Sequence, residues 1–246
     1  MEITTDRVHI NVEGKTMGGY LVRPADGTPR PAVLVFMEIF GINSHIRDVT
    51  ERVAREGYVA LAPDFFHRTG PGVEYGYDQQ GMEAGIKLYT QLKADEMIAD
   101  ARAAMSFLKR QNFAQGDKIG AMGFCVGGHM TYLTACETEV KAAASFYGGG
   151  IAKEQAFGGA PSTVGRTSKI TGKILCLFGE KDASIPLSEV EAIRAALQKH
   201  NIRHEVIVYP EADHGFFCDQ RATYNKAAAE DAWVRVKKLF AEELRK

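Results

Sequence analysis

Six short runs of apolar residues, separated by longer amphipathic stretches, constrain the fold of this chain most strongly. The runs are rich in Val, Ile, Leu and Ala and lie at residues 32–37, 58–62, 118–122, 141–147, 173–178 and 204–209. Such nearly continuous apolar runs are typical of strands covered on both faces, and their alternation with helices implies parallel crossovers. We therefore predict an α/β fold with a mostly parallel sheet and helices on both faces.

The remaining segments complete this predicted architecture. Residues 7–12 and 17–22 alternate in polarity around a Glu-Gly-Lys turn, which predicts an N-terminal antiparallel hairpin. Apolar residues at helical spacing predict helices at residues 44–56, 83–110, 127–136, 187–200 and 223–244. The glycine-rich segments 67–85 and 148–168 are predicted to be long surface loops. Because each is followed by a segment that the same sheet needs, we predict a single domain over residues 1–246.

Composition and charge exclude several classes of protein. Of the 246 residues, 45% are hydrophobic and 25% are charged, as in ordinary globular proteins and unlike disordered chains. The 30 Lys and Arg residues nearly balance the 31 Asp and Glu residues, so no overall field favours nucleic acid or an anionic membrane. The apolar runs are far shorter than the roughly 20 residues that cross a bilayer, and the N-terminus does not resemble a secretory signal. We expect a cytoplasmic protein without nucleic-acid or membrane partners.

The four cysteines are spread along the chain without the spacing of a zinc site or a disulfide framework, so no metal and no cofactor are expected. One of them, Cys125, follows the third apolar run in the sequence Gly123-Phe-Cys-Val-Gly127 and precedes a predicted helix. This is the nucleophile-elbow pattern with cysteine in the serine position, and the helix N-terminus beneath it favours a thiolate. The alternative is a buried structural cysteine in a glycine-rich turn.

Two later residues follow strand ends in the order expected for a catalytic triad. Asp182 comes after the run 173–178, and His214 comes after the run 204–209. Open α/β sheets carry their sites at these strand ends, and the order nucleophile, acid, base is that of α/β-hydrolases. Singly, Asp182 could cap a helix and His214 could be an ordinary loop histidine, and Glu180 and Asp213 are competing acids. Asp213 is the weaker competitor, because adjacent residues in a turn rarely aim their side chains at one another.

A fourth candidate, Glu38, follows the run 32–37 and should lie at the same edge of the sheet. Its alternative is an exposed charge at a strand end. The turn at Gly41 should bring the Ile39 N–H close to the elbow, where it would form an oxyanion hole with the Val126 N–H. Among the other histidines, His45, His67 and His129 are expected to be hydrogen-bonded surface or helix residues.

Several motifs taken together resemble the dienelactone hydrolase family. They are Met37-Glu-Ile-Phe-Gly-Ile-Asn43, Pro63-Asp-Phe-Phe66, Gly123-Phe-Cys-Val-Gly-Gly128, Phe146-Tyr-Gly148 and His214-Gly-Phe216, and they span nearly the whole chain. The resemblance implies an α/β-hydrolase fold without a large cap and a Cys125-Asp182-His214 triad. It also implies that Glu38 helps to generate the thiolate and that the amides of Ile39 and Val126 hold the oxyanion.

The sequence departs from that family where substrate is bound. Well-known members carry an arginine four residues after the histidine, which here is Cys218, and a second arginine that aligns near Met82. The two cations that grip a substrate carboxylate are thus unmatched, and Arg221 is a candidate replacement. We predict that Arg221 lines the substrate site with Phe40 and Tyr147.

These observations predict a cysteine hydrolase of small activated esters or lactones, of the carboxymethylenebutenolidase type, that works through an acyl group on Cys125. A broader carboxylesterase or thioesterase is the first alternative, and a non-catalytic ligand-binding protein on a hydrolase scaffold is the second. The expected partner is a small-molecule ester or lactone, and the chain is expected to be a monomer or a homodimer.

Overall fold

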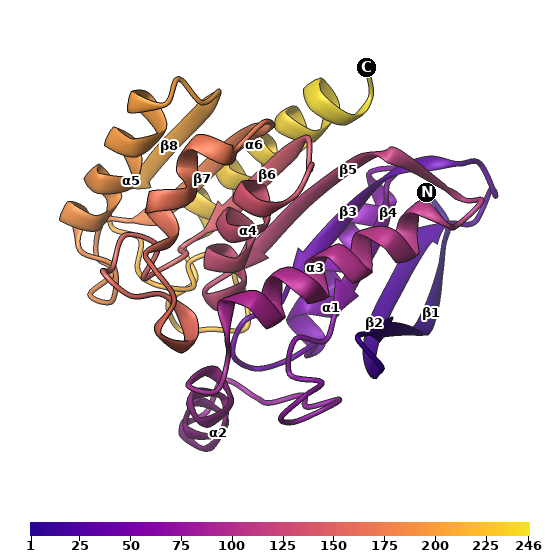
Figure 1. Cartoon of the computed structure of the whole chain (residues 1–246), viewed down its shortest axis with the longest axis horizontal. Helices are drawn as coiled ribbons and strands as arrows, with labels where there is room; N and C mark the ends of the chain where they lie inside the picture. The colour runs from indigo at the N-terminus through magenta and orange to yellow at the C-terminus, as the bar shows by residue number, and fades with distance from the viewer.

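A computed structural model describes all 246 residues and contains one eight-stranded sheet (Figure 1). Its strands lie in the order β1-β2-β4-β3-β5-β6-β7-β8. The strands are β1 Ile3–Val12, β2 Lys15–Pro24, β3 Arg30–Phe36, β4 Val59–Pro63, β5 Ala114–Phe124, β6 Ala142–Phe146, β7 Lys173–Gly179 and β8 His204–Tyr209. β1 and β2 form the predicted antiparallel hairpin and join the sheet antiparallel to β4, whereas all the other pairs are parallel.

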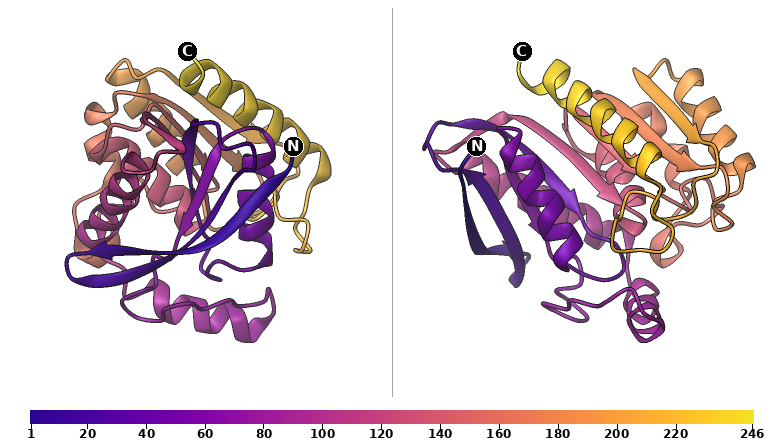
Figure 2. Two further views of the ribbon diagram at one scale, coloured as in Figure 1. Left: turned by 90° about the vertical axis from the view of Figure 1, so that its right-hand side faces the viewer. Right: turned by 180° about the vertical axis from the view of Figure 1, so that it is seen from behind.

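The helices cover both faces of the sheet. They are α1 Ser44–Arg55, α2 Gln79–Tyr89, α3 Ala94–Lys109, α4 Val126–Glu137, α5 Leu187–Lys199 and α6 Lys226–Leu244. α1 and α6 lie on one face, whereas α3, α4 and α5 lie on the other (Figures 1 and 2). This sandwich buries a hydrophobic cluster of 74 residues, so the central strands are apolar on both sides, as their sequences predicted. The predicted mostly parallel α/β fold is confirmed.

The long helix predicted over residues 83–110 is wrong, because the structure has two helices there. α2 ends at Tyr89, and α3 begins at Ala94 with Asp95 and Glu96 in its first turn, where carboxylates stabilise the helix dipole. Between them Leu92 is buried, which a continuous helix would not require. α2 also begins within the predicted loop 67–85, since the side chain of Asp78 accepts a hydrogen bond from the Gly81 N–H and caps the helix. α2 projects beyond the sheet layers at the edge that carries the site (Figure 1).

The second predicted loop, residues 148–168, contains two short 3-10 helices, Phe157–Gly159 and Thr163–Lys169.

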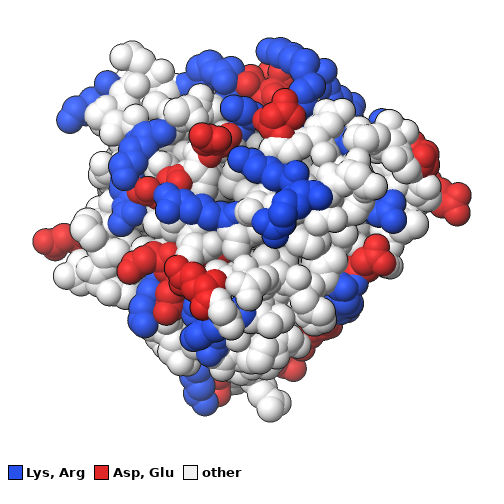
Figure 3. All heavy atoms as spheres, turned by 45° about the vertical axis from the view of Figure 1, so that its right-hand side comes forward, with Lys and Arg blue, Asp and Glu red and all other residues white.

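The surface shows no separation of charge on the face drawn in Figure 3, where basic and acidic side chains intermingle. None of the helices combines the length and the apolar character that crossing a membrane requires.

Candidate active site

Cys125 occupies a strained turn between β5 and α4. Its φ is 58°, in the left-handed region that residues other than glycine rarely adopt. The turn is held because the Cys125 N–H donates to the Phe146 carbonyl at 3.1 Å and the Cys125 carbonyl accepts from the Gly128 N–H at 2.9 Å. Cys125 is half-buried and caps α4, whose first N–H groups have no partner within the helix. The turn therefore presents the sulfur to the cleft at a helix N-terminus, as predicted for an elbow.

The glycines that flank Cys125 are required by close backbone approaches. A Cβ at Gly123 would lie 2.3 Å from the Gly127 carbonyl oxygen, and a Cβ at Gly127 would lie 2.4 Å from the Phe36 carbonyl oxygen. Neither position tolerates a larger residue without moving the backbone, so the Gly-x-Cys-x-Gly pattern has a steric cause in this fold.

His214 and Asp182 are joined by a hydrogen bond of 2.6 Å between Nδ1 and Oδ2. Asp182 is buried, and its other oxygen accepts from the Ser184 N–H at 2.9 Å, which fixes the carboxylate. The competing acids point elsewhere: Glu180 is exposed, and Asp213 is exposed and accepts from the backbone N–H of His214. Asp182 is thus the acid that orients the imidazole, while Cys125 and His214 line the same cleft.

The imidazole of His214 favours its charged form. Burial on its own would lower the pKa of His214, but the neighbouring Cys125 and Asp182 outweigh burial and raise this pKa to about 10. Beneath the imidazole lies Tyr147, whose ring centroid is 5.1 Å from that of His214. Tyr147 is completely buried and is not part of the cleft wall, so in this structure it supports His214 instead of facing a substrate.

Alkylation of Cys125 should report this charge. While His214 is protonated, its cation next to the sulfur attracts an anionic reagent. The ratio of the iodoacetate rate to the iodoacetamide rate should therefore be higher for Cys125 than for a free thiol. Because the pKa of His214 is raised, this relative preference should persist at neutral pH and disappear as the pH rises through about 10. The measurement is the ratio of the two alkylation rates against pH, and a ratio that falls between pH 6 and 7 would contradict it.

Glu38 is completely buried at the end of β3 and is held by two neighbours. Arg221 Nη1 donates to Oε1 at 3.1 Å and forms a salt bridge, and the Tyr77 hydroxyl donates to Oε2 at 2.8 Å. Gly215, at a φ of 79°, leaves room for the guanidinium, since a Cβ there would lie 2.5 Å from Arg221 Nη1. The predicted exposed alternative for Glu38 is excluded. No hydrogen bond joins Glu38 to Cys125 in this arrangement, and sequence reasoning missed Tyr77.

The loop that follows Glu38 holds the Ile39 amide at the cleft. Ile39 lines the cleft with Cys125 and Val126, and its N–H has no hydrogen-bond partner in the protein. Gly85 of α2 packs against the other side of the loop, because a Cβ at Gly85 would lie 2.4 Å from the Ile39 carbonyl oxygen. The N–H groups of Ile39 and of Val126, the first residue of α4, are therefore both available at the cleft.

The cleft above Cys125 has a volume of about 330 Å³ and is mostly apolar. Phe40 and Arg221 line it, together with Met82, Ile86 and Tyr89 of α2. Arg221 also stacks near two rings, with its guanidinium carbon 5.9 Å from the Phe40 centroid and 5.5 Å from the Tyr77 centroid.

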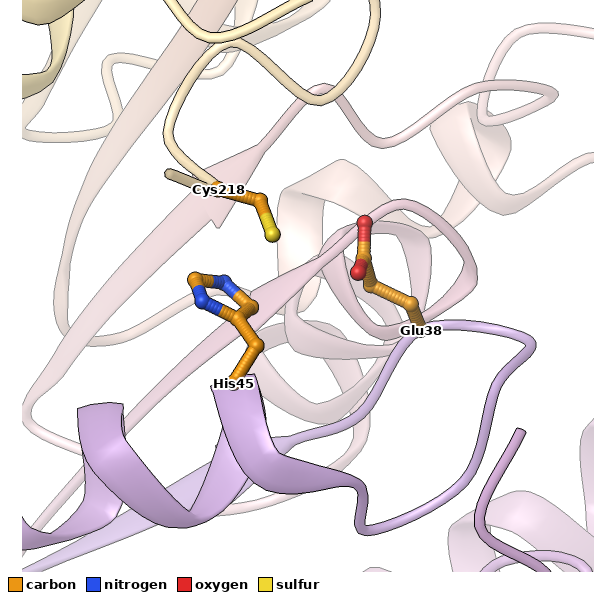
Figure 4. Close-up of side chains that lie close together, drawn as sticks. All are labelled: Glu38, His45 and Cys218. Atoms are coloured by element: carbon orange, nitrogen blue, oxygen red, sulfur yellow. The ribbon is translucent and has the colours of Figure 1, made fainter. Parts of the chain in front are cut away.

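A cluster of possible metal ligands lies behind the cleft. Glu38, His45 and Cys218 converge there, with one ligand atom of each within 4.8 Å of the others (Figure 4). Both oxygens of Glu38 are already engaged by Arg221 and Tyr77, and burial raises the pKa of the Cys218 thiol to about 11. The side chains therefore balance their charge without a cation. His45 lies in α1, as the helix alternative of its prediction has it, but its buried Nε2 has no hydrogen-bond partner, so the expected hydrogen bond at that atom is absent.

The strand order, the helices on both faces and the strained turn after β5 define an α/β-hydrolase. Residues 17–244 match the dienelactone hydrolase family. A Synechocystis sp. protein named as a carboxymethylenebutenolidase is 46% identical over 245 residues, which cover 100% of this chain and 99% of the relative. A relative of the same name from Escherichia coli K12 is 36% identical, with coverage of 94% and 84%.

Solved structures agree with the sequence relatives. A Klebsiella pneumoniae protein named as a dienelactone hydrolase superposes with a TM-score of 0.89 at 34% identity, covering 98% of this chain and 100% of that chain. A dienelactone hydrolase-like promiscuous phosphotriesterase from metagenomic libraries has a TM-score of 0.84 at 24% identity, with coverage of 99% and 99%, which shows a shared fold alone. The chain belongs to the dienelactone hydrolase family and is a hydrolase, as the motifs predicted.

Proposed function

We propose that the protein hydrolyses small activated esters or lactones, an activity of the carboxymethylenebutenolidase type, through a covalent acyl group on Cys125. The observation that carries the proposal is the joint geometry of the strained Cys125 turn and the 2.6 Å His214–Asp182 hydrogen bond at one cleft. The names of the sequence relatives support the same substrate class.

In the proposed acylation step, the Cys125 sulfur attacks the ester carbonyl and the carbonyl π electrons move to oxygen. The N–H groups of Ile39 and Val126 stabilise this oxyanion. The intermediate collapses to a thioester, and His214 gives its proton to the departing alkoxide. In the second step His214 takes a proton from water, the hydroxide attacks the thioester, and the acid and the Cys125 thiolate are released.

This mechanism predicts the preferred leaving groups. A thiolate leaves a tetrahedral adduct as readily as it attacks, so esters with poor leaving groups return to substrate. Two classes of substrate avoid this return: aryl esters, and lactones that open to an enolate. Amides should be poor substrates, because their amine leaves less readily than the sulfur.

Trapping the intermediate tests the proposal. The protein is mixed with a slowly deacylated aryl ester, quenched in acid and digested, and the peptide that contains Cys125 is weighed by mass spectrometry. The expected result is a mass increase equal to the acyl group on Cys125 that disappears with the rate of turnover. Two results would overturn the proposal. One is an acyl group on another residue, and the other is turnover with neither an acylated peptide nor an initial burst of the released phenol. Parallel assays with a dienelactone, a nitrophenyl ester and an acyl thioester separate the lactonase from a broader esterase or thioesterase.

Glu38→Gln should slow acylation by about 100-fold or more, as for loss of a group that acts in proton transfer. We propose that Glu38 assists formation of the Cys125 thiolate when Arg221 or Tyr77 releases it, and glutamine keeps the size of the side chain while removing the charge. Single-turnover acylation and the rate of Cys125 alkylation against pH measure the effect.

Glu137→Gln is the matched control for Glu38→Gln. Glu137 likewise accepts hydrogen bonds from two side chains, those of Arg166 and Lys169, but it does not line the cleft. Unchanged acylation and alkylation in Glu38→Gln would remove Glu38 from the catalytic set and leave it as the partner of Arg221.

A further inference from the structure

A second compartment adjoins the cleft of Cys125. It has a volume of about 190 Å³, and it shares Tyr89, Gly150 and Lys153 with the wall of the first. Neither Cys125 nor His214 borders it, so this compartment is remote from the reacting atoms. A substrate that extends past Tyr89 and Gly150 would place its distal end there.

Two aromatic rings form one wall of this compartment, and a hydrogen-bonded histidine forms part of another. The Tyr89 and Phe157 rings meet edge to face at 5.8 Å. The buried His129 joins the wall, with Nδ1 2.9 Å from the Gly149 carbonyl oxygen and Nε2 2.7 Å from the Thr163 hydroxyl. Because both nitrogens of His129 have partners, the imidazole holds the Gly149–Gly150 turn and leaves Lys153 as the charged group of the wall.

Lys153 is a cation without a counter-charge. It is exposed, and it takes part in none of the salt bridges of the structure. Neither compartment has an Asp or Glu in its wall, and the adjacent Glu154 lines neither of them. The other basic groups of the cleft are already paired, Arg221 with Glu38 and the imidazolium of His214 with Asp182. An anion entering the cleft therefore meets its one uncompensated cation at the junction with the second compartment.

We propose that the second compartment is a subsite for an anionic group at the distal end of an ester substrate, held by Lys153 beside the Tyr89 and Phe157 rings. The ammonium is a compact point charge, so carboxylate and phosphate are both suitable anions. This inference rests on the proposed ester hydrolysis at Cys125 and defines the substrate class further: esters whose charge is several bonds away from the scissile carbonyl.

Matched ester pairs test the subsite. One series consists of mono-4-nitrophenyl esters of adipic to sebacic acid, each compared with its uncharged methyl ester. A second series consists of aryl acetates whose leaving groups are ω-(4-hydroxyphenyl)alkanoic acids, again with their methyl esters. In a third series an ω-phosphate, paired with its uncharged dimethyl ester, replaces the carboxylate. The quantity measured is the ratio of kcat/KM for the anionic ester to that for its neutral partner, at low and at high salt. The series that shows the preference identifies the acyl or the alcohol side and separates carboxylate from phosphate.

For the wild type we expect a ratio of about 10 in at least one series, larger for long chains than for short ones and reduced by salt, because exposed charges are screened. Lys153→Met should bring the ratio to about 1, and Lys153→Glu should bring it below 1. Lys87→Met is the control, since Lys87 is exposed on α2 and lines neither compartment. It should retain the wild-type ratio.

Three results would overturn the subsite: ratios near 1 in all three wild-type series, a ratio that Lys153→Met leaves unchanged, or a preference that is strongest when the anion is next to the scissile carbonyl. Each of these leaves the proposed function standing as long as the wild type turns over the neutral esters and forms the Cys125 adduct. Failure of the proposed function has a separate signature, which is turnover of the neutral esters without that adduct.

Discussion

Cys125→Ala is expected to lower kcat/KM for ester hydrolysis by about 10⁴-fold or more, as for removal of the nucleophile from other hydrolases that form acyl-enzymes. Alanine cannot form the thioester, and the oxyanion N–H groups can then assist only direct attack by water. Cys125→Ser should also be strongly impaired, because a serine hydroxyl has a far higher pKa than a thiol and does not exist as a resting anion beside His214. Steady-state kinetics with an aryl ester and with a dienelactone measure both losses.

Cys136→Ala is the matched control for these variants. Cys136 is buried in α4, on the same helix that Cys125 caps, and it is absent from the wall of the cleft. It should keep near wild-type turnover at some cost in stability. Undiminished turnover in a folded Cys125→Ala variant would contradict the proposed mechanism. Thermal unfolding of each variant shows whether a loss reflects chemistry or folding.

Most of the sheet could be predicted from sequence because each strand has a recognisable local pattern of apolar residues. The runs that became β3 and β7 are apolar at nearly every position, and in the structure both faces of these strands are covered. The helix boundary between α2 and α3 could not be predicted in the same way. No glycine or proline interrupts residues 86–98, and the break depends on burial of Leu92 by tertiary packing.

The residues of the candidate site differ in the same way: those at strand ends could be predicted, and those in long connecting segments could not. Cys125, Asp182 and His214 could be predicted because each follows a strand, and the ends of parallel strands meet at one edge of the sheet. Tyr77 and Lys153 come from long segments between strands, and no periodic pattern fixes where such segments fold. Tyr147 could be predicted to lie near the site, but its φ of 37° turns its side chain into the core beneath His214, and nothing in the residue type indicates this.

Asp182→Asn should lower kcat by about 10⁴-fold, the loss measured when the acid of a comparable triad is replaced by its amide. The structure gives a specific reason. Asp182 Oδ1 accepts from the Ser184 N–H at 2.9 Å, so the asparagine carbonyl will occupy that position and its NH₂ group will face His214 Nδ1. Nδ1 must then accept a hydrogen bond, which puts the proton of the neutral imidazole on Nε2 and leaves no lone pair there for a proton from Cys125 or from water.

The same substitution should change the pH dependence in a defined direction. Asp182 is one of the groups that raise the pKa of His214, so its neutralisation should lower the pH at which the iodoacetate preference of Cys125 is lost, from about 10 in the wild type. Glu180→Gln is the control, because Glu180 is exposed and two residues away, and it should alter neither kcat nor this pH. If Glu180→Gln produced the larger loss, Glu180 would be the acid of the triad. If neither substitution affected turnover, His214 would act without a carboxylate, and the buried Asp182 would serve only to hold the turn through Ser184.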